Sequence, residues 1–387
     1  MESELLVTLG AILVASVVTD AVAGRLPLPR VTLLVLLGVA IGPSGFDLLP
    51  PAADEALSVT TTVALAMVAF LLGGDLSFDR LRDDGRRILL VSAGVVAGTV
   101  VAVAAGLWLL GYGLALALVL AGVATATDPV AVREVVRESG TKNRFTRTLL
   151  GVVAIDDAWG IVVFGLLAAL AGIVAGGGGG WTPVTHAAWE LGGSVVLGLA
   201  IGLPAAWATG RLRRGQPTQA EAVGVVLLLA GLAASLEVSE LLAAMIAGAV
   251  VANLARHHTR SFSAIEQIEW PFMVFFFVLA GSRLELDAAV DAAWLLAAFM
   301  ALRVVGRVAG GALAGGRRPG DGARVDIGLS LLPQAGVALG MALVAADRFP
   351  ELREPLLAVA LASTVLFELV GPILTRAMVA RSAVRGR

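Results

Sequence analysis

Thirteen long apolar segments, separated by short loops that carry most of the charge, constrain this chain more than any other feature. Hydrophobic residues make up 58% of the 387 positions, and charged residues make up 15%. A water-soluble domain of this length needs a far more charged surface, whereas about 20 consecutive apolar residues suffice to cross a bilayer. We therefore expect an all-α polytopic membrane protein with 13 transmembrane helices. The segments are expected at 5–22, 31–41, 56–72, 88–110, 113–132, 146–175, 184–209, 220–235, 241–255, 265–281, 288–315, 325–346 and 356–379.

The basic residues predict how these segments are oriented. Nearly all of the 28 Lys and Arg residues lie in every second loop or after the last segment, and only Arg283, Arg348 and Arg353 lie in the remaining loops. Because cytoplasmic loops retain an excess of Lys and Arg, we expect a multi-pass protein of the cell (inner) membrane with its N-terminus outside and its C-terminus in the cytoplasm. The basic loops are short and form no continuous patch, so no nucleic-acid partner is expected.

Two of the segments contain a proline at matched positions. The run Ala124-Thr125-Ala126-Thr127-Asp128-Pro129 lies in 113–132, and Pro333 lies in 325–346. Proline removes a backbone donor and clashes with the preceding turn, so the first helix is predicted to break near Thr127 and Asp128. Paired broken helices in inverted halves indicate the central site of a transporter, although a proline can also merely kink a helix. We expect two inverted six-helix repeats with crossed broken helices, interrupted at Pro129, Pro333, Gln334 and Gly336.

Two adjacent carboxyl groups, Asp156 and Asp157, lie in the apolar segment 146–175. A charged side chain inside a bilayer is unfavourable, so a functional role is the default interpretation. Helix neighbours point about 100° apart, so one carboxyl can face a cavity while the other faces a partner helix. A carboxylate that holds either a proton or a monovalent cation is the minimum chemistry for exchange. The structural alternative is that hydroxyl and backbone groups merely satisfy both acids.

Other polar side chains surround this pair in the predicted arrangement. Asp128 either binds the ion or neutralises the positive end of a half-helix, and Thr125 and Thr127 either add ligand oxygens or bond to their own backbone. Arg303 and Arg307 lie four residues apart, hence on one helix face. A buried guanidinium needs an anion, unless one arginine extends to the membrane interface instead. The candidate anions are Asp156, Asp157, Asp128 and Glu368.

The runs Thr127-Asp128-Pro129-Val130-Ala131-Val132, Ile155-Asp156-Asp157 and Leu332–Gly340 resemble the cation:proton antiporter superfamily, and the resemblance covers essentially the whole chain. It implies a homodimer whose protomers each combine a dimerisation part with a mobile, elevator-like ion-carrying core. It also implies that Asp157 is the principal carrier, that Na+ is bound by Asp157 and Asp128, and that Asp156 pairs with Arg307. The dimerisation part is expected at about 5–72 and 220–281, the core at about 88–175 and 288–379, and a linker at about 184–209.

The motifs combine features of two branches of that superfamily. The Thr-Asp-Pro run resembles the electroneutral branch, whose sixth span usually carries Asn-Asp preceded by Glu-Ser, but here Asp156 replaces the Asn and Val152 and Val153 occupy the earlier positions. The Asp-Asp pair resembles the electrogenic branch, which typically has lysine where Arg307 stands. The resemblance therefore favours two protons per cation. The arginine weakens any mechanism in which the basic residue itself releases a proton.

These patterns predict a secondary active antiporter, not an enzyme, that exchanges Na+ or Li+ for H+ with competition at Asp157 and without a cofactor. The expected partners are the bilayer, the cation, the proton and a second protomer. K+/H+ exchange is the alternative of the same class. A passive channel and an intramembrane aspartyl protease are alternatives of other classes. The protease requires a Gly-x-Gly-Asp run on a second helix, and Gly73-Gly74-Asp75 lacks that spacing.

Overall fold

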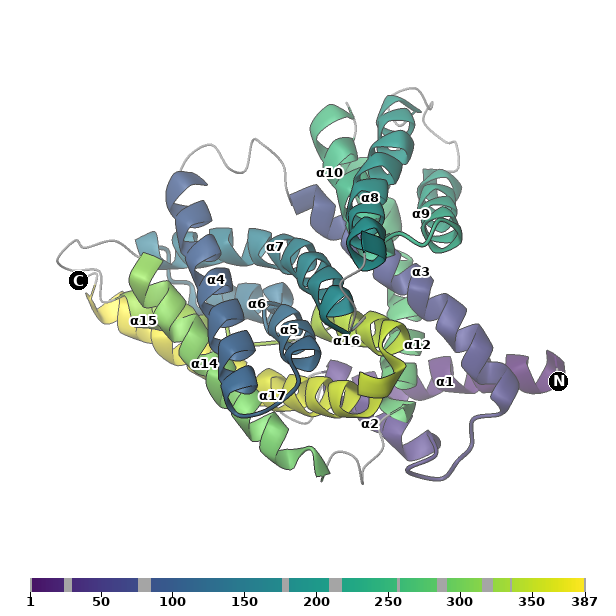
Figure 1. The fold of residues 1–387 in the computed structure, drawn as a ribbon, viewed down its shortest axis with the longest axis horizontal. Helices are drawn as coiled ribbons and strands as arrows, with labels where there is room; N and C mark the ends of the chain where they lie inside the picture. Colours follow the sequence, from purple (N-terminus) through teal and green to yellow (C-terminus); the bar gives the residue numbers. More distant parts are fainter. Residues whose placement is uncertain are drawn as a thin grey trace. The chain divides into compact units, whose positions relative to one another are not determined.

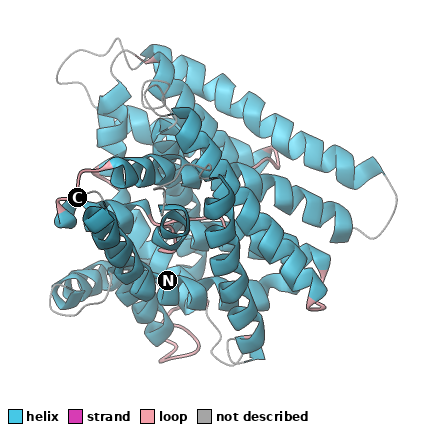
Figure 2. Ribbon diagram, turned by 90° about the vertical axis from the view of Figure 1, so that its left-hand side faces the viewer, coloured by secondary structure: helices cyan, strands magenta, loops and turns pink. Residues whose placement is uncertain are grey.

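The computed structural model describes residues 2–23, 30–75, 85–175, 181–208, 218–255, 258–283, 291–314, 323–334 and 336–385. Within these ranges the chain forms helices joined by loops and turns, and no strand occurs among them (Figure 2). The expected all-α class is therefore confirmed. The helices are α1 (Glu2–Ala23), α2 (Arg30–Ile41), α3 (Pro51–Asp75), α4 (Gly85–Leu109), α5 (Leu114–Val123), α6 (Pro129–Ser139), α7 (Arg144–Ala175), α8 (Trp181–Ala208), α9 (Thr218–Ser235), α10 (Glu240–Leu254), α11 (His258–Glu266), α12 (Glu269–Ser282), α14 (Ala293–Ala314), α15 (Ala323–Ser330), α16 (Gly336–Arg348), the 3-10 turn η1 (Pro350–Leu352) and α17 (Arg353–Arg385).

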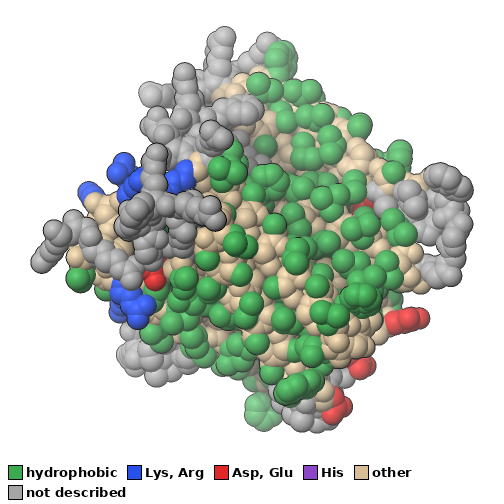
Figure 3. Space-filling view, turned by 60° about the vertical axis from the view of Figure 1, so that its left-hand side comes forward, with side chains coloured by type: hydrophobic (Ala, Val, Ile, Leu, Met, Phe, Trp, Pro, Cys, Tyr) green, Lys and Arg blue, Asp and Glu red, His purple; other side chains and the backbone are tan. Residues whose placement is uncertain are grey.

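Several of these helices have the length and composition of membrane spans. Five are long and apolar enough to cross a bilayer, and seven shorter apolar helices accompany them in the described ranges. Large hydrophobic side chains such as Leu6, Val196 and Leu313 are exposed to the surroundings, and hydrophobic side chains dominate the face drawn in Figure 3. Such a surface suits lipid, because apolar patches of this extent are rare on soluble monomers. The count of thirteen spans stays a prediction.

The two segments with prolines at matched positions are both interrupted. α5 ends at Val123 and α6 begins at Pro129, so the first break comprises residues 124–128, where the sequence predicted it. Proline suits the first position of α6 because its missing N–H would have no partner inside the helix. α15 ends at Ser330 and α16 begins at Gly336, and the described residues of this second break are 331–334.

One further helix was not predicted. α11 lies almost wholly in the loop expected before residue 265, and the segment expected at 265–281 corresponds to α12, which begins after the turn at Gln267 and Ile268. Pro271 lies in the first turn of α12 and cannot donate a hydrogen bond to the carbonyl group four residues earlier. A helix continuing from α11 would need that bond, so the proline marks the start of a new helix.

The helices form two compact units. Unit 1 comprises Met1–Asp79 and Gly179–Glu285, and unit 2 comprises Arg80–Gly178 and Leu286–Arg387. Within unit 1, α3 and α8 both pack on α10, and α2 packs on α12. Glycine permits one of these contacts, because a Cβ atom at Gly73 would lie 2.1 Å from the carbonyl oxygen of Met245. The roles of dimerisation part, ion-carrying core and linker stay predictions.

Unit 2 is built around the pairing of α4 with α14 (Figure 1). Gly94 and Gly98 on α4 face Gly306 and Gly310 on α14, and a Cβ atom at Gly310 would lie 2.3 Å from the carbonyl oxygen of Gly94. Small residues spaced by four let two membrane helices approach until their backbones touch. This seam fixes the position of α14, which carries both buried arginines.

The half-helices of unit 2 are held on an apolar cluster. Buried side chains of α4, α6, α7, α15 and α17 meet there, so α6 and α15 are anchored beside their respective breaks by hydrophobic contact. Because a close-packed interior resists displacement of its members, the cluster gives the broken segments a rigid support. Its buried members are Val91, Val95, Val132, Val136, Phe145, Leu149, Val152, Val153, Ile327, Leu331, Met378 and Val379.

Candidate ion-binding site

A fully buried ion pair joins α14 to α7 at the level of the first break. Nη1 of Arg307 lies 3.0 Å from Oδ2 of Asp156, and both side chains have 0% exposure. The structure thus brings together the two residues whose pairing the superfamily resemblance implies. Both are deeply buried, so Arg307 does not extend to a membrane interface.

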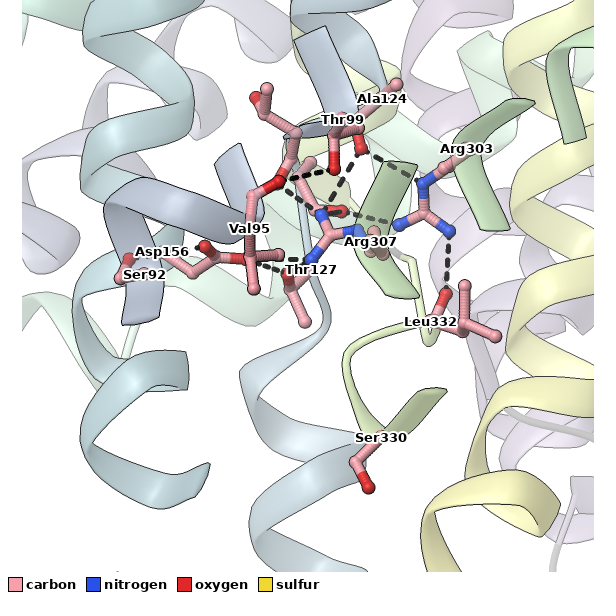
Figure 4. A network of polar contacts seen from close by, with 12 residues as sticks. Ser92, Val95, Thr99, Ala124, Thr127, Asp156, Arg303, Arg307, Ser330 and Leu332 are labelled. Atoms are coloured by element: carbon pink, nitrogen blue, oxygen red, sulfur yellow. Dashed lines mark hydrogen bonds and ion pairs between the residues drawn. The ribbon is translucent and has the colours of Figure 1, made fainter. Parts of the chain in front are cut away.

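Two hydroxyl groups complete the surroundings of the Asp156 carboxylate (Figure 4). Thr127, in the first break, donates to Oδ2, and it accepts from Nη1 of Arg307 at 2.9 Å. Ser92 of α4 donates to Oδ1 at 3.5 Å. Asp156 therefore has a cation and two hydroxyl partners, which offset the unfavourable burial of its charge.

The second terminal nitrogen of Arg307 binds the carbonyl groups that follow the C-terminal end of α5. Nη2 lies 3.2 Å from the carbonyl oxygen of Ala124, 2.5 Å from that of Thr125 and 2.9 Å from that of Ala126. The last carbonyl groups of a helix have no partner inside it, and they form the negative end of its dipole. A guanidinium group satisfies both requirements.

Arg303, one helical turn away, binds both breaks at once (Figure 4). Its Nε lies 3.0 Å from the carbonyl oxygen of Ala124 and its Nη2 lies 2.7 Å from that of Ala126, while Nη1 reaches Leu332 in the second break at 2.8 Å. The guanidinium carbon also lies 4.3 Å from the ring centroid of Phe367, a cation–π distance.

The pairing of Arg303 with a carboxylate stays a prediction, because the side chain of Asp157, one of the candidate anions, lies outside the described residues. Its hydrogen bonds to the described residues all go to carbonyl groups, because the two interrupted helices present several of them in one place. Glu368, expected as a balancing anion, is buried on α17 next to Phe367. Neither Arg303 nor Arg307 donates a hydrogen bond to it within the described part of the chain.

Asp128 ties the first break to the second. Its backbone N–H donates to the carbonyl oxygen of Pro333 at 2.9 Å, and its carboxylate oxygen Oδ1 accepts from the N–H of Ala131 at 3.1 Å. The second contact is a helix N-cap at the positive end of α6. The structure thus shows the capping role of Asp128, whereas its role as an ion ligand stays a prediction.

The remaining predicted site residues lie at or near the breaks. Thr125 donates to the carbonyl oxygen of Gly122 at 2.6 Å, so its hydroxyl bonds to its own backbone. Pro333 and Gln334 are buried in the second break, and Gly336 begins α16. Asp157 belongs to α7, but its side chain lies outside the described residues, so its proposed role as carrier stays a prediction.

Several contributors to this site were not predicted from the sequence. They are the hydroxyl of Ser92, the ring of Phe367 and the carbonyl groups of 124–126. The carbonyl groups were foreseeable, because a helix broken by proline must leave some unsatisfied. The glycine pairs Gly94–Gly98 and Gly306–Gly310 are a known signal of close helix pairing and would have placed α14 against α4. Nothing in the sequence pattern distinguishes Ser92 or Phe367 from neighbouring apolar-helix residues.

The chain matches the family described as "Sodium/hydrogen exchanger, transmembrane" over residues 11–381. The chain belongs to the sodium/hydrogen exchanger family. Family membership makes it a multi-pass membrane transporter of the cation/proton antiporter type and not an enzyme, which confirms both the resemblance and the expected class of activity.

Individual relatives agree with this assignment. The ammonium/H+ antiporter subunit AmhT of Alkalihalophilus pseudofirmus is 25% identical over 346 residues, which cover 87% of this chain and 85% of that protein. The structure of the sodium proton antiporter MjNhaP1 of Methanocaldococcus jannaschii at pH 8 matches with a TM-score of 0.71 and 18% identity, over 98% of this chain and 96% of that one. A structure of MjNhaP1 from electron microscopy matches with a TM-score of 0.69 and 17% identity. At these identities the structural likeness establishes the fold.

Proposed function

We propose that this exchanger carries Na+ or Li+ in one direction and protons in the other, with both competing for the carboxyl group of Asp157. The buried pair of Asp156 with Arg307 supports this proposal. A guanidinium group stays charged in proteins, and separating a buried ion pair is strongly unfavourable. Asp156 is therefore committed to Arg307, and Asp157, the next residue of α7, is the carboxyl group left for the cargo.

The first break supplies the rest of the proposed binding site. Asp128 is buried there, and its N-cap contact engages Oδ1. We propose that Asp128 and Asp157 together bind the cation, with oxygen of Thr127 or Thr125 nearby. The cation and the proton are cargo, and no cofactor takes part in the proposed cycle.

The proposed stoichiometry is two protons per cation. Arg307 cannot release a proton, and Asp156 is its partner. We propose that the two protons bind at Asp157 and Asp128. Exchange on this scheme moves net charge, so an imposed membrane potential changes its rate.

The wider architecture is also part of the proposal. We infer thirteen spans in two inverted repeats, with an N-terminus outside and a C-terminus in the cytoplasm of the cell membrane. The protein would act as a homodimer in which the core moves in an elevator-like manner. Support comes from the paired breaks, from the charge distribution between loops and from the fold shared with MjNhaP1.

Ammonium is the second candidate cargo. The observation in its favour is the 25% identity to an ammonium/H+ antiporter subunit over most of both chains. K+ remains the third candidate, because the described residues do not fix the size of the ion. Family membership removes the aspartyl protease from consideration.

Proton movement in proteoliposomes tests the proposal. With an internal pH dye and an outward or inward gradient of Na+, Li+, K+ or NH4+, the wild type should show cation-dependent proton flux, strongest with Na+ or Li+. Asp157→Asn should abolish it. Asp347→Asn is a matched control, because it makes the same change at an exposed residue that pairs with Arg353. Cation flux without proton movement would refute antiport, and a fully active Asp157→Asn variant would refute the carrier assignment.

A further inference from the structure

Gln334 occupies the point where the two breaks touch. It is 0% exposed and belongs to the second break. It directly follows Pro333, whose carbonyl oxygen accepts the backbone N–H of Asp128 at 2.9 Å. The side chain is buried against α17, which carries Thr364, and its residue directly follows the one whose carbonyl group joins the two interrupted helices.

One end of the Gln334 amide is left without a partner. Its Nε2 donates to Oγ1 of Thr364 at 3.4 Å, whereas no donor among the described residues reaches Oε1. A buried acceptor without a donor is unfavourable by about 1–3 kcal/mol, and such atoms are few in native proteins. An apolar side chain would not have this unfavourable burial of an oxygen atom. The amide oxygen of Gln334 is therefore expected to have a function.

Several other oxygens at the two breaks are already engaged. Arginine side chains bind the carbonyl groups of Ala124, Ala126 and Leu332. The backbone N–H of Asp128 binds the carbonyl oxygen of Pro333. Oε1 of Gln334 is the side-chain oxygen in this region that no described donor satisfies. It is therefore available to a cation.

We propose that the amide oxygen of Gln334 is a ligand of the transported monovalent cation, an assignment that rests on the proposed function. Carbonyl oxygens can replace the hydration shell of a monovalent cation. An amide oxygen, unlike a carboxylate, does not bind a proton near neutral pH. Gln334 therefore strengthens binding of the cation without strengthening binding of the competing proton, and it shifts the competition at the carboxyl group in favour of the cation.

Gln334→Met tests the proposal, because methionine has a similar length and no hydrogen-bonding oxygen. The apparent KM for the transported cation should rise roughly tenfold, the loss expected for one ligand to a charged group. The maximal rate at saturating cation should stay within about twofold, because proton binding is unchanged. The midpoint of thermal unfolding in detergent should stay the same or rise, since the unsatisfied buried oxygen is gone.

Control variants distinguish a role of Gln334 in cation binding from a role in packing. Thr364→Val removes the partner of Nε2 and retains Oε1, so its KM should equal that of the wild type. Gln334→Leu repeats the test if the methionine variant does not accumulate. An unchanged KM in the Gln334 variants would overturn the proposal. A lowered unfolding midpoint together with a raised KM and a lowered maximal rate would overturn it as well. Either result leaves the proposed function intact if the wild type exchanges, whereas a wild type without cation-dependent proton flux refutes the proposed function itself.

Discussion

The two breaks of unit 2 are satisfied by different chemistry. Arginine side chains bind all three carbonyl groups of 124–126 in the first break. At the second break, Arg303 binds the carbonyl group of Leu332, and the backbone N–H of Asp128 binds the carbonyl group of Pro333. The hydroxyl of Thr375 donates to the carbonyl oxygen of Ser330 at 3.0 Å. The first break is therefore held by charged donors and the second mainly by neutral ones.

This difference indicates which of the two breaks is the more rigid. Hydrogen bonds to charged groups contribute about 1.5–3 kcal/mol each, compared with about 0.5–1.5 kcal/mol for neutral pairs. The first break also carries the ion pair between Arg307 and Asp156. We infer that the first break is a rigid platform beside the binding site, whereas the second break rearranges more easily when the cargo changes.

The largest effect is expected for Arg307→Gln. It leaves the buried Asp156 carboxylate without its cation and weakens the capping of the first break, so the free energy of unfolding should fall by about 3–5 kcal/mol. Chemical denaturation in detergent measures this. The double variant Asp156→Asn/Arg307→Gln should recover part of the loss. A single variant as stable as the wild type would show that charge does not hold the first break.

Arg303→Lys should have the next largest effect. A lysine cannot bind carbonyl groups of both breaks in the fixed fork of a guanidinium, so the loss should be about 1.5–3 kcal/mol. Exchange should also slow, because the link between the breaks through Arg303 is lost. Denaturation and proteoliposome flux measure the two quantities. Full stability with full flux would mean that the link through Leu332 is dispensable.

Thr375→Val tests the neutral side of the comparison. It removes one hydroxyl that lies 3.0 Å from the carbonyl oxygens of both Ser330 and Gly371, so the loss should be about 0.5–1.5 kcal/mol. The same denaturation experiment gives the value. A loss as large as that of Arg307→Gln would contradict the ranking of the two breaks.

Asp128→Asn should change stability least and separates two roles. Asparagine caps helices about as well as aspartate, so the free energy of unfolding should change by only a few tenths of a kcal/mol. If the carboxylate is also a cation ligand, the KM for the cation should rise severalfold in the flux assay. An unchanged KM would leave Asp128 as a helix cap only.

The sequence predicted the positions of the site better than its contacts. Pro129 and Pro333 located both breaks, because proline acts through local backbone geometry. Asp156 and Arg307 were identified because charge in an apolar helix is conspicuous. The helix α11 was missed, because most of its residues lie in a polar stretch that was assigned to a loop.

Contacts between distant segments were beyond local reasoning. Two of the three carbonyl partners of Arg303 come from residues about 180 positions away, and their location depends on how α14 packs on α4. The orphaned Oε1 of Gln334 is likewise visible only when its neighbours are in place. Spacing rules report on one helix, whereas these contacts depend on the tertiary arrangement.

The capping of the first break by α14 has a consequence for biosynthesis. Residues 124–126 are made well before Arg303 and Arg307, and at about 5–20 residues per second the interval is roughly 10–40 s. During that time the carbonyl groups after the end of α5 lack the guanidinium groups that satisfy them, and Asp156 lacks its cation. The nascent first half of unit 2 must therefore stay near water, lipid headgroups or the insertion machinery until α14 has been made.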